Sequence, residues 1–143
     1  NNILQDYNLK GLVEPLGFKK SSLQFKSLAV EIINSLQKNK LQLVHDTFHH
    51  KLSNENNFFS SLTGLVHFSG VSNNYDNINL QDDHRSIVDE ADIIDNISQI
   101  KKLIKENYNG YFSFEPFSNE LITNKDIFEI TKNCLNFIIK QIK

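Results

Sequence analysis

The sequence of 143 residues contains one cysteine, two prolines, five glycines and neither methionine nor tryptophan. The single Cys134 excludes an internal disulfide bond, which is typical of a reducing compartment, and we expect a cytoplasmic protein. No window approaches ~18 consecutive apolar residues, so we expect no membrane-spanning helix, and no basic segment followed by an apolar run indicates a secretion signal. Because the chain begins at Asn1 and has no methionine, we interpret it as a processed or partial chain.

An excess of charge of one sign is also lacking. The chain has 15 Lys and Arg against 17 Asp and Glu, a formal net charge of −2. This balance excludes binding of polyanions by bulk charge, so we expect no nucleic-acid partner. A glycine-rich phosphate loop and a nucleophile elbow are both absent. The length suits one domain with a core and is too short for two, so we expect a single domain over residues 1–143.

Short apolar runs alternate with amphipathic segments along the chain. The expected strands cover residues 11–13, 41–44, 65–68 and 111–114. The expected helices cover about residues 23–36, 55–62, 95–104 and 125–142. Four strand–helix units in a row predict parallel βαβ connections. They are compatible with an open doubly wound sheet or with half of a closed (β/α)8 barrel, because a full barrel needs ~250 residues.

Both prolines follow a glutamate at the end of an expected strand, as Glu14-Pro15 and Glu115-Pro116. Proline holds the preceding residue in an extended conformation and has no N–H for the sheet, so it ends the strand. Both carboxylates are therefore expected where the βα loops of parallel folds build active sites. Each glutamate alone is equally well explained as a solvated acid beside a strand terminator, but the repetition favours a site.

The two middle strands also carry potential metal ligands near their carboxyl ends, Asp46 and His67. Because side chains alternate along a strand, these two residues and Glu115 are expected to point away from the helices. With Glu14, they can converge at one end of a curved sheet. Three carboxylates and one imidazole suit Mn²⁺, Mg²⁺, Co²⁺ or Zn²⁺. We therefore predict a metal site formed by Glu14, Asp46, His67 and Glu115.

Three other histidines lie close together in the sequence. His49 follows Asp46 by three residues, and we expect it to reach over the same site and bind substrate. His45 is expected to point toward the helices as a packed histidine. His50 is expected on the surface of a loop.

Arg85 is the only arginine in the sequence, and it lies in a long loop that covers residues 71–91. Long loops in compact domains are often functional. Arginine offers oxyanions and vicinal hydroxyls a rigid fork of donors that lysine lacks, so we predict that Arg85 binds substrate. The alternative is a local ion pair with Asp82 or Asp83.

Five strings occur in a fixed order: VEPLG from Val13, HDTFHH from His45, VHFSGV from Val66, DHR from Asp83 and FSFEPF from Phe112. In this order they resemble the xylose isomerase-like TIM barrels, and within them the sugar phosphate isomerase and epimerase group. The resemblance covers about residues 12–120 and corresponds to the last four βα units of the barrel. The implied fold class is thus α/β, with four parallel βα units forming the C-terminal half of a TIM barrel.

The resemblance implies that the four predicted ligands hold a divalent metal ion and that Glu14 and Glu115 are also the catalytic acid/base pair. The implied enzyme is a sugar isomerase or epimerase that moves a proton on a ketose or inosose through an enediolate. His49 and Arg85 match positions that hold substrate oxygens. Residues 86–92 lack the Gly-x-Gly turn of many members, so the identity of the sugar or polyol does not follow.

The resemblance also implies that the N-terminal half of the barrel is missing from this sequence. Open strand edges pair readily with other strands, so the alternative is that the chain assembles as a homo-oligomer.

Two further functions remain open. The same superfamily includes AP endonucleases of the endonuclease IV type, which use three zinc ions. Seven residues can be aligned with ligands of that cluster: Glu14, Asp46, His49, His67, Asp82, His84 and Glu115. The few cations available for DNA phosphates argue against this function. The other alternative is a non-catalytic, sugar-binding barrel remnant, against which the presence of all four ligand positions argues.

Overall fold

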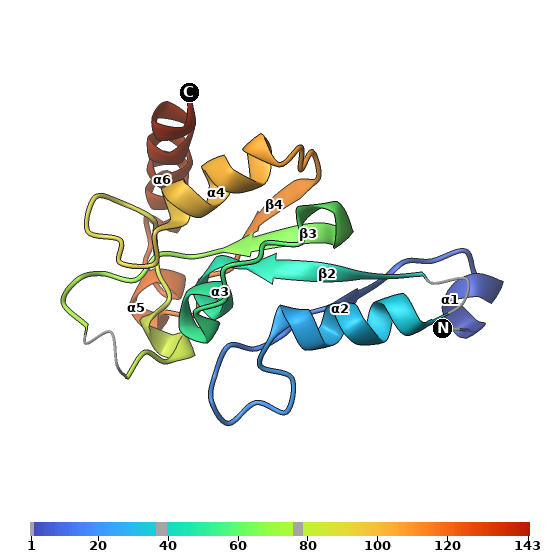
Figure 1. Ribbon diagram of the computed structural model, residues 1–143. Coiled ribbons are helices and arrows are strands. Elements are labelled where there is room, and N and C mark those ends of the chain that lie inside the picture. Colours follow the sequence, from blue (N-terminus) through green and yellow to red (C-terminus); the bar gives the residue numbers. More distant parts are fainter. Residues whose placement is uncertain (1, 37–39, 76–78) are drawn as a thin grey trace.

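A computed structural model describes residues 2–36, 40–75 and 79–143 (Figure 1). One parallel sheet contains four strands in chain order, β1 (Gly11–Val13), β2 (Leu41–Asp46), β3 (Thr63–Phe68) and β4 (Tyr111–Phe114). The described helices are α1 (Asn2–Asp6), α2 (Lys26–Ser35), α3 (Thr47–Ser53), α4 (Asn96–Lys105), α5 (Asn119–Ile122) and α6 (Ile127–Ile142). The four parallel βα units expected from the hydrophobic pattern are confirmed.

The register of the sheet brings the carboxyl ends of the four strands together at one end of the sheet. Asp46 at the end of β2 pairs with His67 in β3, and His67 pairs with Ser113 in β4. At the other side of β2, Val13 pairs with Leu43. The chain therefore leaves all four strands at the same end of the sheet, where α3 and α5 lie, whereas α1 lies at the opposite end (Figure 1).

Helices α2, α4 and α6 pack on one face of the sheet through apolar side chains. Leu43 of β2 packs against Ala29 and Ile33 of α2. The next strand, β3, places Phe68 in a cluster with Ile100 of α4 and with Cys134, Ile138 and Phe114. The same strand places Val66 against Leu103. The alternation predicted for β2, β3 and β4 is thus confirmed, and Asp46 and His67 lie on the other face of the sheet.

The prediction of a helix over residues 55–62 is wrong. The structure has α3 immediately after β2, and a 3₁₀ turn at Ser60–Leu62. The carboxylate of Asp46 accepts a hydrogen bond from the backbone N–H of His49, which caps the N-terminus of α3. Asn54 (φ 55°) then ends the helix in the left-handed conformation that asparagine tolerates well.

This shift of the helix also changes the environment of His50. Because α3 begins directly at the end of β2, His50 is buried rather than on the surface of a loop, and that prediction is wrong. Its ring lies 4.8 Å from the ring of His45 and 4.4 Å from that of Phe58. Burial lowers the pKa of His50 to about 3, so its imidazole is neutral in the folded protein. His45 is buried on the helix side of the sheet, as predicted.

Apolar side chains are exposed at both edges of the sheet. Tyr111 of edge strand β4 is 84% exposed and Leu12 of edge strand β1 is 43% exposed. On α6, Phe128 is 90% exposed and lines an apolar groove of about 520 Å³ together with Ile127, Leu135 and Ile139. Such edges and faces are where further βα units pack in a larger fold.

None of the described helices combines the length and the apolar character needed to cross a membrane.

A buried lysine predicts how stability depends on pH. Lys26 of α2 is 4% exposed, and its Nζ lies 2.9 Å from His45 Nδ1 and 3.4 Å from the carbonyl oxygen of Phe58. Burial lowers the pKa of Lys26 to about 7, although Glu55 and Glu106 act in the opposite direction. Between this value and the ordinary lysine pKa, the unfolded chain binds more protons than the folded chain. Stability therefore rises with pH over that range.

We expect the free energy of unfolding, measured by urea denaturation, to rise by about 2 kcal/mol between pH 7 and pH 9. In Lys26→Met this rise should be lost, because the group that releases the proton is absent. Lys132→Met, which changes a lysine in an exposed ion pair, is the control and should keep the wild-type slope. Equal slopes in wild type and Lys26→Met would contradict the assignment.

Candidate metal centre

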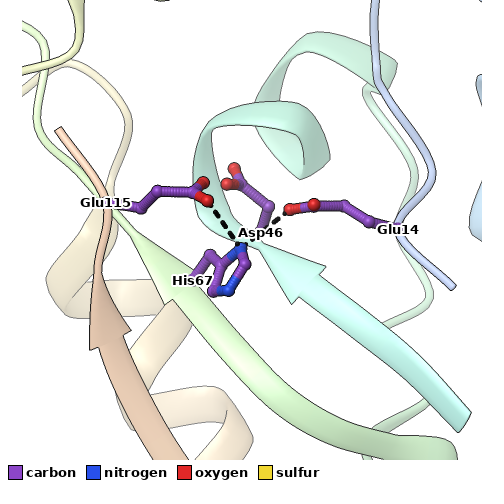
Figure 2. Close-up of side chains that lie close together, drawn as sticks. All are labelled: Glu14, Asp46, His67 and Glu115. Carbon is purple, nitrogen blue, oxygen red and sulfur yellow. Dashed lines mark hydrogen bonds and ion pairs between the residues drawn. The ribbon is translucent and has the colours of Figure 1, made fainter. Parts of the chain in front are cut away.

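The polar face of the sheet brings the four predicted ligands together (Figure 2). Asp46 is the last residue of β2 and His67 lies in β3, while Glu14 and Glu115 directly follow β1 and β4. Figure 2 shows the two glutamates reaching in from opposite sides, with Asp46 and His67 between them. The predicted convergence of Glu14, Asp46, His67 and Glu115 at the strand ends is therefore present in the structure.

The spacing of the donor atoms suits a single ion. His67 Nδ1 lies 2.9 Å from Glu14 Oε1 and 3.3 Å from Glu115 Oε1. One ligand atom from each of the four residues lies within 4.8 Å of the others. Ligands on opposite sides of an ion with bonds of ~2.0–2.6 Å are ~4–5 Å apart. Three carboxylates and one imidazole thus fit one divalent ion in both chemistry and spacing.

The charges in this group affect one another strongly. The hydrogen bond to Glu14 raises the pKa of His67, and the charges of Glu115 and Asp46 act in the same direction. Burial works to raise the pKa of Glu14, but the hydrogen bond and charge of His67 bring it below the usual value. Burial raises the pKa of Glu115 in spite of His67 and Arg85. A histidine must lose its proton to bind a metal ion, so metal binding at these residues would depend on pH.

Arg85 is the cation that neutralises two of these acids. It is 1% exposed, and its Nη2 donates to Asp46 Oδ2 at 2.6 Å and to Glu115 Oε2 at 2.9 Å. Its Nη1 also lies 3.3 Å from Asp82 Oδ1, so the alternative of a local ion pair is correct for Asp82 as well. The side chain of Arg85 thus spans from the loop at 71–91 to the ends of two strands.

Aromatic rings and a hydroxyl hold the guanidinium in place. The centre of the guanidinium lies 5.0 Å from the ring of Phe48 and 4.8 Å from that of Phe117. Arg85 Nε donates to Ser69 Oγ at 2.8 Å. The sequence indicated neither the pair of rings nor the role of Ser69, although all three residues lie within four positions of a predicted ligand.

His49 lies beside the group of four but is not part of it. It is 4% exposed, and its ring packs against Phe18 and Phe48 with centroids 5.2 Å and 5.4 Å away. Its Nδ1 has no hydrogen-bond partner among the described residues. Burial lowers the pKa of His49, which keeps its imidazole neutral. A buried polar atom without a partner is unfavourable unless another molecule supplies one.

Asp82 and His84, which the three-zinc alternative requires, also lie outside the group of four in the described part of the chain. The ring of His84 stacks on that of Tyr75 with centroids 4.1 Å apart. Its Nδ1 accepts a hydrogen bond from the backbone N–H of Gln81 at 3.2 Å.

Two glycines permit the loops to pack closely around the site. A Cβ atom at Gly17 would lie 2.1 Å from the carbonyl oxygen of His49. A Cβ atom at Gly70 would lie 1.9 Å from the carbonyl oxygen of Ile87. Each glycine lies three residues after a predicted ligand, Glu14 or His67, so each loop is held against its neighbour by a backbone contact that excludes a side chain.

Residues 2–135 match the sequence model of the xylose isomerase-like TIM barrel family, and the chain belongs to this family. The four parallel strands with their helices are therefore part of such a barrel. A search of curated proteins gave no match.

Solved structures resemble nearly the whole chain. A xylose isomerase domain-containing protein from Salmonella typhimurium is 32% identical with a TM-score of 0.87, over 96% of this chain and 53% of its own. The IolI protein, solved with a bound zinc atom, is 18% identical with a TM-score of 0.79, over 99% and 51%. The 3-keto-D-glucoside 4-epimerase YcjR from E. coli is 17% identical with a TM-score of 0.67, over 97% and 49%. The chain thus spans about half the length of these structures.

The role of Arg85 in the site predicts a large effect on stability. In Arg85→Met, Asp46 and Glu115 lose their cation while Asp46 stays buried, so we expect the metal-free protein to lose about 3 kcal/mol of unfolding free energy. Urea denaturation in the presence of EDTA measures this loss. The matched control, Lys132→Met, breaks an exposed ion pair with Glu129 and should change stability by less than about 1 kcal/mol. Losses of equal size in the two variants would contradict this role.

Proposed function

We propose that the protein containing this chain is a divalent-metal-dependent sugar isomerase or epimerase that acts on a ketose, an inosose or a related polyol. The observation that carries the proposal is the group of Glu14, Asp46, His67 and Glu115, whose donor atoms lie within 4.8 Å of one another. The names of similar structures support it, because they include a 3-keto-D-glucoside 4-epimerase, a D-tagatose 3-epimerase-like protein and a D-psicose 3-epimerase.

Glu14, Asp46, His67 and Glu115 would hold the metal ion. A divalent ion at these residues would supply positive charge that stabilises an enediolate formed from the substrate. The similar IolI structure was solved with a bound zinc atom, which supports a divalent metal ion in this protein. Mn²⁺, Co²⁺, Mg²⁺ and Zn²⁺ are all compatible with three carboxylates and one imidazole.

Glu14 and Glu115 would be the catalytic acid and base. They reach the group from opposite sides (Figure 2). One carboxylate can take a proton from the carbon next to a carbonyl group, and the other can return a proton to the opposite face of the planar intermediate. Epimerisation requires two such groups, because a single base on one face returns the proton to the same side.

His49 and Arg85 would contact substrate oxygens. His49 offers a neutral imidazole whose Nδ1 has no partner among the described residues. Arg85 binds Asp46 and Glu115 through Nη2 and would contact a substrate oxygen that lies next to these acids. This contact would add to the positioning of the two carboxylates.

The whole protein would also supply the other half of the barrel. The exposed edges β1 and β4 and the apolar groove on α6 support four further βα units packed against this chain. We propose that these units precede residue 1 in the same polypeptide. Assembly of two copies is the alternative, and the mass of the natural polypeptide distinguishes the two.

Metal titration of the whole protein tests the proposed ligands. We expect one Co²⁺ per chain, detected by visible absorption, and a loss of affinity of at least ~100-fold in His67→Ala, because loss of a ligand exceeds the effect of an outer-shell change. His84→Ala is the matched control and should bind Co²⁺ like the wild type. Three zinc ions per chain, with one lost in His84→Ala, would instead favour the AP endonuclease alternative.

Isotope exchange tests the proposed reaction. With Mn²⁺ or Co²⁺, the whole enzyme should incorporate deuterium from deuterated water at the carbon next to the carbonyl group of its ketose. Glu115→Gln should abolish this incorporation because the amide cannot accept the proton, whereas the exposed Glu120→Gln should leave it unchanged. Turnover without deuterium incorporation would contradict proton transfer and favour a hydride shift. Cleavage of abasic DNA without exchange on any ketose would contradict the sugar function as a whole.

A further inference from the structure

Polar side chains fill the core directly behind the candidate metal centre, on the face of the sheet that the helices cover. Asn96 and Gln99, one turn apart on α4, are 0% and 6% exposed. Lys26, His45 and Thr47 are buried beside them. Each polar group here has lost its contact with water and must find a protein partner. Asn96 and Gln99 bond to residues within two positions of the proposed metal ligands, and they also bond to Asp92 and to the carbonyl oxygen of Ile94 just before α4.

Asn96 links the ends of two ligand-bearing strands. Its Oδ1 accepts a hydrogen bond of 2.7 Å from the hydroxyl of Thr47, the residue after Asp46. Its Nδ2 donates at 2.9 Å to the carbonyl oxygen of Ser69, two residues after His67. The hydroxyl of the same Ser69 accepts the 2.8 Å hydrogen bond from Arg85. One side chain of α4 therefore fixes the distance between the segments that carry Asp46 and His67.

Gln99 bonds to the residues that precede and follow Asp46 in the sequence. Its Nε2 donates to the carbonyl oxygen of Thr47 at 3.0 Å, and its Oε1 lies 3.1 Å from Nε2 of His45. Lys26 Nζ donates to His45 Nδ1 at 2.9 Å, so a neutral His45 carries its proton on Nε2 and donates it to Gln99. Burial keeps the pKa of His45 well below its usual value, in agreement with a neutral imidazole. The residues before and after Asp46 are thus both bound to Gln99.

We propose that Asn96 and Gln99 are positioning residues that set the spacing of Asp46 and His67 from the opposite face of the sheet. The proposal rests on the proposed metal function. Binding sites require ligands held to within ~0.5 Å, and outer-shell hydrogen bonds change metal affinity by ~10–100-fold. An apolar core at Asn96 and Gln99 would pack without such bonds, but it would leave the backbone on both sides of Asp46 free to shift.

Thr47→Val and Gln99→Met in the whole protein test this inference. Thr47→Val keeps the shape of the side chain and removes the hydroxyl bound to Asn96, so it changes one hydrogen bond. Gln99→Met keeps the length and removes the bonds to Thr47 and His45, together with a 2.8 Å bond to the carbonyl oxygen of Ile94. We expect the dissociation constant of Co²⁺ to rise by about tenfold in each variant, with a shifted visible spectrum. Thr47→Ser, which restores the hydroxyl, should return the constant and spectrum to wild-type values.

Ile33→Ala is the control for lost stability alone. Ile33 is buried between α2 and β2, where it packs against Ala29 and Leu43 and not against the centre. This variant should unfold at lower urea concentration while its dissociation constant for Co²⁺ stays at the wild-type value. Wild-type Co²⁺ affinity in both Thr47→Val and Gln99→Met would overturn the positioning role and leave the proposed function intact. A wild-type protein that binds no Co²⁺ would overturn the proposed function, and the positioning role with it.

Discussion

The repulsion between carboxylates is the constraint on which this end of the molecule depends. A parallel sheet in register places Glu14, Asp46 and Glu115 at the carboxyl end of the strands, where their negative charges repel one another. The buried Arg85 supplies positive charge that stabilises this arrangement in the chain itself, and the hydrogen bond to Glu14 raises the pKa of His67. The acids are therefore held close together before any ion binds, as a metal centre requires, and the fold accepts an electrostatic strain that a purely structural strand end would not need.

The face of the sheet that the helices cover also carries buried polar side chains. An apolar core would be expected between β2 and α4, yet Asn96, Gln99 and Lys26 lie there and bind residues adjacent to the ligands. Buried polar groups whose hydrogen bonds are all made give a core a single arrangement. The helices thus do more than cover the sheet, since one turn of α4 connects the segments that hold Asp46 and His67. The packing of α4 on one face of the sheet is thereby linked to the positions of Asp46 and His67 on the other face.

The four strands, the direction of their side chains and the group of four could be predicted from local patterns in the sequence. The strand order could not, because the pattern fitted a doubly wound sheet as well as half of a barrel, and only the family resemblance favoured the barrel. The two Glu-Pro pairs mark strand ends, and alternation along β2 and β3 directs Asp46 and His67 to the polar face. The position of α3 and the burial of His50 could not be predicted, because they depend on a cap by Asp46 and a left-handed Asn54 in a segment rich in asparagine. The full set of partners of Arg85 was also beyond the sequence, since Asp46 and Glu115 lie 39 and 30 residues away.

Membership of the xylose isomerase-like TIM barrel family and the geometry of the group of four both support the proposed function, a metal-assisted proton transfer on a sugar. The central claim is that one ion binds at Glu14, Asp46, His67 and Glu115. Anomalous diffraction from crystals of the whole protein, grown with Co²⁺ and measured at the cobalt edge, tests it most directly. We expect one peak per chain, at ~2.0–2.6 Å from a donor atom of each residue. A peak bound by other side chains, or several peaks per chain, would contradict it.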